Sequence, residues 1–275
     1  MGTIMRILGE CRPCRIKRIT QNAVNRKKIT FCRKTHCYKI AWARSAHMQD
    51  NETEASVREQ KTVWQGLGHY YRPWALARLF ALNVSRAQKL ERQAKPVECL
   101  EIPKILDRRI HSSICSVEYK PWYETFKKDL FERFWARLSR EAQQRLSVCL
   151  EGVALPVTRA HGDLKVDNIY VDAKGRLKII DWECSRNSGS CVTDIVNLFK
   201  SIDRRSGGGR ITGGPFNPTY TAWARSFCMP AVCSKYSVSQ LSLLGSIDAI
   251  CRDDEFCDTG KRTDLFVKSL DATER

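Results

Sequence analysis

The stretch HGDLKVDNIYVDAKGRLKIIDWE, from His161 to Glu183, holds the polar residues around which the rest of the chain can be interpreted. Asp163 is followed five positions later by Asn168, and Asp181 ends a short apolar run. A phosphoryl-transfer site needs a carboxylate that accepts a hydroxyl proton and oxygen ligands for Mg²⁺. The spacing therefore predicts a site in which Asp163 is the base and Asn168 and Asp181 hold Mg²⁺.

Two short apolar segments flank a turn inside this stretch. Ile169 to Val171 and Leu177 to Ile180 surround the sequence Asp172-Ala173-Lys174-Gly175, in which glycine tolerates a positive φ. This pattern predicts a β-hairpin. A hairpin returns the chain to its starting point, so we expect Asn168 and Asp181 to reach one metal ion.

Strand-like segments come first along the chain, and helical periodicity dominates later. The predicted strands are Arg15 to Thr20, Ile29 to Cys32, Cys37 to Trp42, a start at Lys104 to Leu106, and Ile114 to Tyr119. The main helical patterns run from Glu52 to Leu67 and from Tyr123 to Val153. This order predicts an α+β fold with a small N-terminal lobe, residues 1-119, and a larger, mainly helical lobe, residues 120-275.

The pattern HxDxxxxN, with IDWE ending the same stretch, resembles the protein-kinase-like superfamily in its aminoglycoside phosphotransferase and choline kinase branch. Gly162 and the DWE ending favour small-molecule kinases over protein serine/threonine kinases. The resemblance implies a bilobal fold with an antiparallel sheet in the first lobe. It also implies ATP and Mg²⁺ as cofactors, and transfer of the γ-phosphoryl group to a hydroxyl of a small molecule or saccharide.

The same resemblance implies roles for residues of the first lobe. Lys39, in CYKIA, is similar to the strand lysine that contacts the α- and β-phosphates, and Glu59 is similar to the helix glutamate that pairs with it. Glu52 and Glu54 are alternatives to Glu59. Lys39 is also one of 47 basic residues and could simply alternate out of a strand.

ICSVEYKPW resembles the strand and hinge between the lobes, which would place the Glu118 carbonyl and the Lys120 amide against adenine. Asp194 resembles an aspartate that frames the catalytic loop. The resemblance gives His161 a structural role near the metal-binding turn, and Glu183 a contact with a second metal ion or the substrate. One departure is the sequence QNAVNRKK, which has no glycine where a phosphate-covering turn is expected.

The net charge of +17 is the most unusual bulk property of the sequence. A basic surface attracts ATP, nucleic acid, anionic lipid headgroups or a phosphorylated saccharide, although it can equally be a solvated face. No aromatic-rich base-stacking motif accompanies the charge, so nucleic acid is not the expected partner. The excess of positive charge favours an anionic acceptor, such as a sugar in a cell-envelope glycolipid, and peripheral contact with an anionic membrane.

Thirteen cysteines occur without a recognisable secretion signal, which favours reduced thiols and a cytoplasmic protein. Cys11, Cys14, Cys32 and Cys37 form an alternative zinc-ligand set, but the spacing of the second pair is unusually wide. The glycine-rich segment 204-218 is expected to be a loop or linker.

Two other classes of function stay open at this point. One is a protein serine/threonine kinase. The other is a non-catalytic kinase-like module that binds nucleic acid or an anionic membrane through its basic lobe, although the presence of Asp163, Asn168 and Asp181 argues against lost catalysis.

Overall fold

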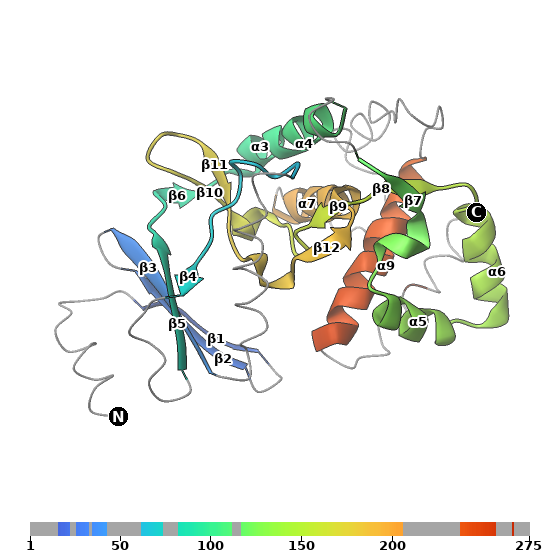
Figure 1. Cartoon of the computed structure of the whole chain (residues 1–275), viewed down its shortest axis with the longest axis horizontal. Coiled ribbons are helices and arrows are strands. Elements are labelled where there is room, and N and C mark those ends of the chain that lie inside the picture. Colours follow the sequence, from blue (N-terminus) through green and yellow to red (C-terminus); the bar gives the residue numbers. More distant parts are fainter. Residues whose placement is uncertain are drawn as a thin grey trace.

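The structure is a computed structural model in which an antiparallel sheet lies at one end and helices with short strand pairs lie at the other (Figure 1). It describes residues 16–22, 26–32, 35–42, 62–73, 82–111, 117–205, 237–256 and 266. This arrangement confirms the predicted α+β class with a sheet lobe followed by a mainly helical lobe. In the described part of the chain, every helix is too short or too polar to cross a lipid bilayer.

The N-terminal sheet has five antiparallel strands in the order β1-β2-β3-β5-β4. They are β1 (Ile16–Asn22), β2 (Arg26–Cys32), β3 (His36–Trp42), β4 (Arg72–Pro73) and β5 (Leu82–Gln88). The first three confirm the strands predicted from alternation. β3 is central, with Lys39 paired to Thr30 on one side and to Ser85 on the other. A central strand is fixed on both edges by hydrogen bonds, so the backbone that carries Lys39 is rigid.

The helix predicted from Glu52 to Leu67 is only partly within the described residues. Its described end, 62–67, is a turn in which the Leu67 N–H donates to the Trp64 carbonyl at 2.9 Å. The Trp64 indole is fully buried and donates its Nε1–H to the Arg159 carbonyl at 2.5 Å. This turn therefore packs against the helical lobe.

The chain passes from the sheet to the helical lobe through residues 89–91. β6 (Arg92–Gln93) then pairs with β10 (Ile169–Val171), which pairs in turn with β11 (Leu177–Ile179). The predicted hairpin is thus confirmed, and Gly175 in its turn has a φ of 75°. β6 adds a third strand, so the first residues after the lobe connection are hydrogen-bonded to the hairpin.

The helical lobe contains six labelled α-helices among the described residues, two of them before residue 112 (Figure 1). They are α3 (Pro96–Cys99), α4 (Glu101–His111), α5 (Lys128–Ala136), α6 (Arg140–Cys149), α7 (Cys191–Arg205) and α9 (Val238–Phe256), with the single described residue Phe266 also helical. The strand predicted to start at Lys104 is wrong, because this segment belongs to α4. Ile102, Leu106 and Ile110 are all buried at a spacing of four, which is a helical face. Pro103 lies in the first turn, where it removes no helical hydrogen bond.

Short elements complete the helical lobe. They are β7 (Tyr119–Pro121), η3 (Trp122–Thr125), β8 (Ala154–Pro156), β9 (Thr158–Ala160), η4 (Val166–Asn168), η5 (Trp182–Cys184) and β12 (Arg186–Gly189). β7 pairs with β8, and β9 pairs with β12. One apolar core runs through this lobe and includes the buried residues of α4. We therefore propose that the boundary between the lobes lies at residues 89–91, before the predicted division at 119/120.

A buried ion pair joins β12 to α9. The Arg186 Nη2 group donates to Asp248, whose side chain is 1% exposed, and the Asn197 amide donates to the other carboxylate oxygen at 3.3 Å. Removing one partner of a buried pair leaves an uncompensated charge in the interior.

We expect Asp248→Ala to lower the free energy of unfolding by about 3–5 kcal/mol, because it leaves the Arg186 guanidinium buried without its carboxylate. Urea-induced unfolding measures this change. The double variant Arg186→Met/Asp248→Leu is the control, and it should recover most of the loss because both charges are gone. A single variant as stable as the wild-type protein would contradict the prediction.

Candidate active site

Lys39 and Asp181 meet where the sheet lobe faces the hairpin. The Lys39 Nζ group lies 2.6 Å from Asp181 Oδ1, and it also lies 4.5 Å from the centroid of the Tyr71 ring. Lys39 is only 6% exposed, so this ammonium group is largely shielded from water. The structure thus brings together a lysine and an aspartate that lie 142 positions apart in the sequence.

Asp181 has an unusual backbone conformation, with φ 70° and ψ 50°, and it is the one non-glycine residue with a positive φ in the described part of the chain. A left-handed conformation costs roughly 1–3 kcal/mol and persists only where its surroundings impose it. The flanking residues do so here. The Ile180 N–H donates to the Asn168 carbonyl at 2.9 Å, and the buried Trp182 indole donates to the Ile179 carbonyl at 2.8 Å.

Asp163 and Asn168 are also in direct contact. The Asn168 Nδ2 group donates to the Asp163 carbonyl at 2.8 Å and approaches Asp163 Oδ2 at 3.3 Å. Both neighbours are oxygens, so the amide nitrogen faces them and Asn168 Oδ1 is directed away, available to a cation. The three residues predicted from the central stretch are therefore linked, because the Asn168 backbone also bonds the residue before Asp181.

Lys165 is part of the site, although its sequence position gave it no specific role. Its Nζ group lies 2.5 Å from Asp163 Oδ2. The ammonium group compensates the charge of the carboxylate and fixes its orientation together with the Asn168 amide. The sequence signal that could have revealed this contact is the short spacing between the two residues in HGDLK.

His161 connects the loop from His161 to Asn168, called here the catalytic loop, to the end of the hairpin. The Asp163 N–H donates to His161 Nδ1 at 3.2 Å, so the ring proton is on Nε2, which donates to the Ile180 carbonyl at 2.9 Å. Burial lowers the pKa of His161 below its ordinary value of 6.5. The histidine is therefore a neutral connector between Asp163 and the residue before Asp181, in agreement with the structural role expected for it.

Asp194, in the first turn of α7, holds the start of the catalytic loop. Its carboxylate accepts hydrogen bonds from the His161 N–H at 2.6 Å and from the Gly162 N–H at 2.9 Å. Burial raises the pKa of Asp194 to about 7, the nearby Asp248 adds to the rise, and the two N–H donors oppose it. Two bonds to successive amides fix both the position and the direction of this backbone.

Gly162 is required by the close approach of the two chain segments. Its φ is +81°, and a Cβ atom at this position would lie 2.2 Å from the Cys184 carbonyl oxygen. No side chain fits between these backbones. The glycine therefore allows the loop that carries Asp163 to pack directly on the turn that follows Asp181.

The donor set fits a magnesium ion that a nucleotide brings with it. Within the described ranges, no group of three or more His, Cys, Asp and Glu side chains forms a metal site. Mg²⁺ in nucleotide sites typically binds one or two protein oxygens and completes its shell with phosphate and water oxygens. Asn168 Oδ1 and the Asp181 carboxylate are two oxygens of this kind, and the Lys39 ammonium group lies beside the second one.

The hinge predicted at Glu118 and Lys120 stays a prediction, and the sheet topology leads us to propose another position for it. Glu118 directly precedes β7 and Lys120 lies within it, so both belong to the helical lobe, where β7 pairs with β8 (Figure 1). The connection that leaves the five-stranded sheet is 89–91 instead. We propose that the hinge lies at 89–91, because α4 and β7 follow this connection in the chain. The structure does not bring Glu118 or Lys120 to the Lys39–Asp181 pair.

Several predicted residues lie outside the described part of the chain. They are Glu59 with its alternatives Glu52 and Glu54, Cys11 and Cys14, and the side chains of Glu183 and Cys32. Most of segment 204-218 also lies there, except for Arg204 and Arg205, which end α7. Cys37 is disulfide-bonded in this structure, which removes its thiolate from a zinc site.

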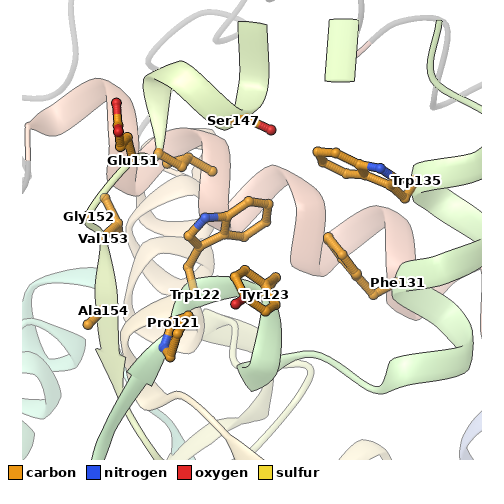
Figure 2. A pocket seen from close by; sticks show the side chains of 11 residues that line it. Pro121, Trp122, Tyr123, Phe131, Trp135, Ser147, Glu151, Gly152, Val153 and Ala154 are labelled. Atoms are coloured by element: carbon orange, nitrogen blue, oxygen red, sulfur yellow. The ribbon is translucent and has the colours of Figure 1, made fainter. Parts of the chain in front are cut away.

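A separate cavity of about 520 Å³ lies among β7, η3, α5 and α6. Figure 2 shows its aromatic wall, formed by Trp122, Tyr123, Phe131 and Trp135, with Glu151 at one side. The Trp122 and Phe131 rings pack edge to face at 5.5 Å between centroids. None of the residues around Asp163 lines this cavity, so it is distinct from the candidate active site.

The model of the phosphotransferase enzyme family matches residues 62–229, which is more than half of the chain. No curated protein matches the sequence. Among solved structures, choline kinase LicA from Streptococcus pneumoniae is similar with a TM-score of 0.58 and 15% identity, over 99% of each chain.

Two further solved structures have the same fold. A putative fructosamine-3-kinase from Haemophilus somnus 129PT has a TM-score of 0.55 and 12% identity, over 98% of this chain and 95% of that one. A thermostable mutant of aminoglycoside phosphotransferase APH(4)-Ia, in a ternary complex with ADP and hygromycin B, has a TM-score of 0.51 and 12% identity, over 98% and 97%. These likenesses confirm the bilobal kinase-like fold.

We expect Gly162→Ala to lower the free energy of unfolding by about 2–5 kcal/mol, because the added Cβ overlaps a backbone carbonyl and the φ is positive. Chemical denaturation measures the change. Gly152→Ala is the matched control, since Gly152 has a φ of +69° and no heavy atom within 4 Å of the added Cβ. It should cost only about 1–2 kcal/mol. Equal costs for the two variants would contradict the packing argument.

We also expect His161 to be mostly neutral at pH 6.5, where an ordinary histidine is half protonated. Long-range ¹H–¹⁵N spectra of the imidazole rings should show the Nε2–H tautomer, with the signal assigned by its loss in His161→Gln. Because the folded pKa lies below the unfolded value, the contribution of His161 to stability is complete above about pH 6.5 and decreases as the pH falls. A charged His161 at pH 6.5 would refute this assignment.

Proposed function

Since the chain belongs to the phosphotransferase enzyme family, we propose that its transfer of a phosphoryl group to a small-molecule hydroxyl takes place at Asp163, Asn168 and Asp181, with ATP as the donor. Two contact groups carry this proposal: Lys39 with Asp181 at 2.6 Å, and Asp163 with Lys165 and Asn168 at 2.5–3.3 Å. The backbone hydrogen bond from the Ile180 N–H to the Asn168 carbonyl joins the two groups. Phosphoryl transfer depends on positioning and on electrostatic stabilisation, and this arrangement supplies both.

Asp163 is the proposed base. Lys165 and the Asn168 amide hold its carboxylate in one orientation, so the carboxylate can accept a hydrogen bond from the acceptor hydroxyl and align the oxygen with the phosphorus. Asp163 is 22% exposed in its side chain, so a substrate hydroxyl can approach it. In this proposal the proton of the hydroxyl passes to Asp163 as the hydroxyl oxygen bonds to the γ-phosphorus, and the bond from that phosphorus to the bridging oxygen breaks to release ADP.

Asn168 Oδ1 and the Asp181 carboxylate are the proposed Mg²⁺ ligands. When bound, the ion neutralises charge on the β- and γ-phosphates. Lys39 contacts Asp181 in this structure, and it is positioned to contact phosphate oxygens once the carboxylate turns to a metal. The lysine thus places a positive charge near the leaving group, and its low exposure strengthens that interaction.

We propose the nucleotide from the ligands of similar solved structures, and the acceptor from the net charge of the protein. The structures similar to this chain include one with AMP and one with ADP and hygromycin B, which supports a nucleotide donor and a hydroxylated acceptor. The net charge of +17 favours an anionic acceptor, such as an acidic or phosphorylated saccharide, because it raises the encounter rate with anions. Peripheral contact with an anionic membrane follows from the same charge and belongs to this proposal.

We expect Asp163→Asn to lower ATP turnover by about 10²–10⁴-fold, because it removes the base while it preserves the shape of the side chain. Turnover is measured with a panel of neutral, cationic and anionic saccharides. Affinity for Mg-ATP, measured by calorimetry, should change less than threefold. The matched control is Asp129→Asn on the exposed face of α5, which should keep full activity. Normal turnover by Asp163→Asn would refute the proposed base.

The same panel tests the acceptor. We expect the anionic saccharides to give the highest kcat/KM, and increasing salt should reduce it, because screening weakens the attraction between an anion and a basic protein. Faster turnover with aminoglycosides than with anionic saccharides would contradict the charge argument and leave the phosphotransferase assignment intact.

A further inference from the structure

Asp167, near the end of the catalytic loop, contacts both the end of α7 and strand β6. Its carboxylate is paired with the Arg205 guanidinium, and the same Oδ1 atom accepts a hydrogen bond from Gln93 Nε2 at 3.1 Å. Gln93 Nε2 also contacts the Val166 carbonyl at 3.3 Å. The carboxylate therefore joins β6, the first strand after the lobe connection, to Arg205, the last residue of α7.

We propose that Asp167 is a positioning residue that sets the place of Asn168, and through it the metal ligand geometry and the orientation of Asp163. This inference rests on the proposed function. Asp167 and Asn168 are adjacent in η4, so a displacement of the Asp167 side chain moves the Asn168 amide. That amide is in turn bonded to the Asp163 carbonyl and approaches its carboxylate.

The geometry of α7 supports this role. Asp194 holds the start of the loop, the Ser201 hydroxyl accepts a hydrogen bond from the Val166 N–H at 3.1 Å, and Arg205 pairs with Asp167. These three helix positions are spaced by seven and then four residues, so they lie on one face of α7. A single rigid helix therefore holds the loop at both ends, on the two sides of Asp163.

The hydrogen bond between Asp167 and Gln93 links the catalytic loop to β6, the strand that follows residues 89–91. Gln93 of β6 lies opposite Tyr170 of β10, and the Ala94 N–H donates to the Ile169 carbonyl at 2.9 Å. The Gln93 side chain then reaches back to η4. Movement of the strand that follows residues 89–91 is thus transmitted to the turn that carries Asn168.

The Asp167–Arg205 ion pair is exposed, which indicates that it contributes more to the geometry of the catalytic loop than to the stability of the fold. The Asp167 and Arg205 side chains are 41% and 49% exposed, and exposed ion pairs add little to folding free energy. A small displacement of a reacting group, in contrast, can cost a large factor in rate. Loss of the pair should consequently appear in metal dependence and turnover more than in thermal stability.

The experiment uses the full chain and measures ATP turnover as a function of Mg²⁺ concentration, with the saccharide of the panel that gives the highest turnover. We expect Asp167→Ala and Arg205→Ala each to lower kcat about tenfold and to raise the Mg²⁺ concentration for half-maximal turnover at least threefold. The double variant should be no worse than either single one, because both remove the same contact. The charge exchange Asp167→Arg/Arg205→Asp should recover part of the activity.

The matched control is Arg204→Ala, the neighbouring exposed arginine, whose Nε group donates to the Lys200 carbonyl of its own helix. It should leave the Mg²⁺ dependence unchanged, and all variants should keep the melting temperature of the control. Additive single effects, or an Asp167→Ala variant indistinguishable from Arg204→Ala, would overturn the inference while leaving the proposed function intact. Absence of Asp163-dependent turnover in the wild-type protein would overturn both.

Discussion

The pair of hydrogen bonds from the His161 and Gly162 amides to the buried Asp194 carboxylate is the interaction on which the site depends. A buried carboxylate is costly unless it is hydrogen-bonded, so the loop and the helix stabilise each other. Because α7 is packed on β9 and on α9, it is a fixed reference for the loop (Figure 1). The position of Asp163 is therefore defined by the core of the helical lobe.

Hydrogen bonds also fix the catalytic loop to the β10–β11 hairpin. The neutral His161 ring joins Asp163 to the Ile180 carbonyl, and Ile180 bonds the Asn168 carbonyl. Between these fixed points, Asp181 takes its left-handed conformation and meets Lys39 of the sheet lobe. The proposed base, the proposed metal ligands and Lys39 are consequently parts of one hydrogen-bonded unit rather than independent side chains.

The sequence predicted structure formed by neighbouring residues better than contacts between segments far apart in the chain. The hairpin was predictable because its turn residues and apolar alternation act over a few positions. The connection between the lobes was harder to predict, because the segment of Glu118 and Lys120 resembles a hinge in its local pattern, while the chain leaves the five-stranded sheet at 89–91. The local sequence of a short strand does not determine which other strand it pairs with.

The sequence by itself determined the chemistry of this protein. The spacing of Asp163, Asn168 and Asp181 predicted a base and two oxygen ligands, which are the roles that we propose for them. Only the tertiary structure decided how they are held. The contacts of Asp194 with the loop and of Asp167 with Gln93 and Arg205 join segments brought together by folding. Such contacts depend on the packing of α7 and β6, which no local pattern of residues encodes.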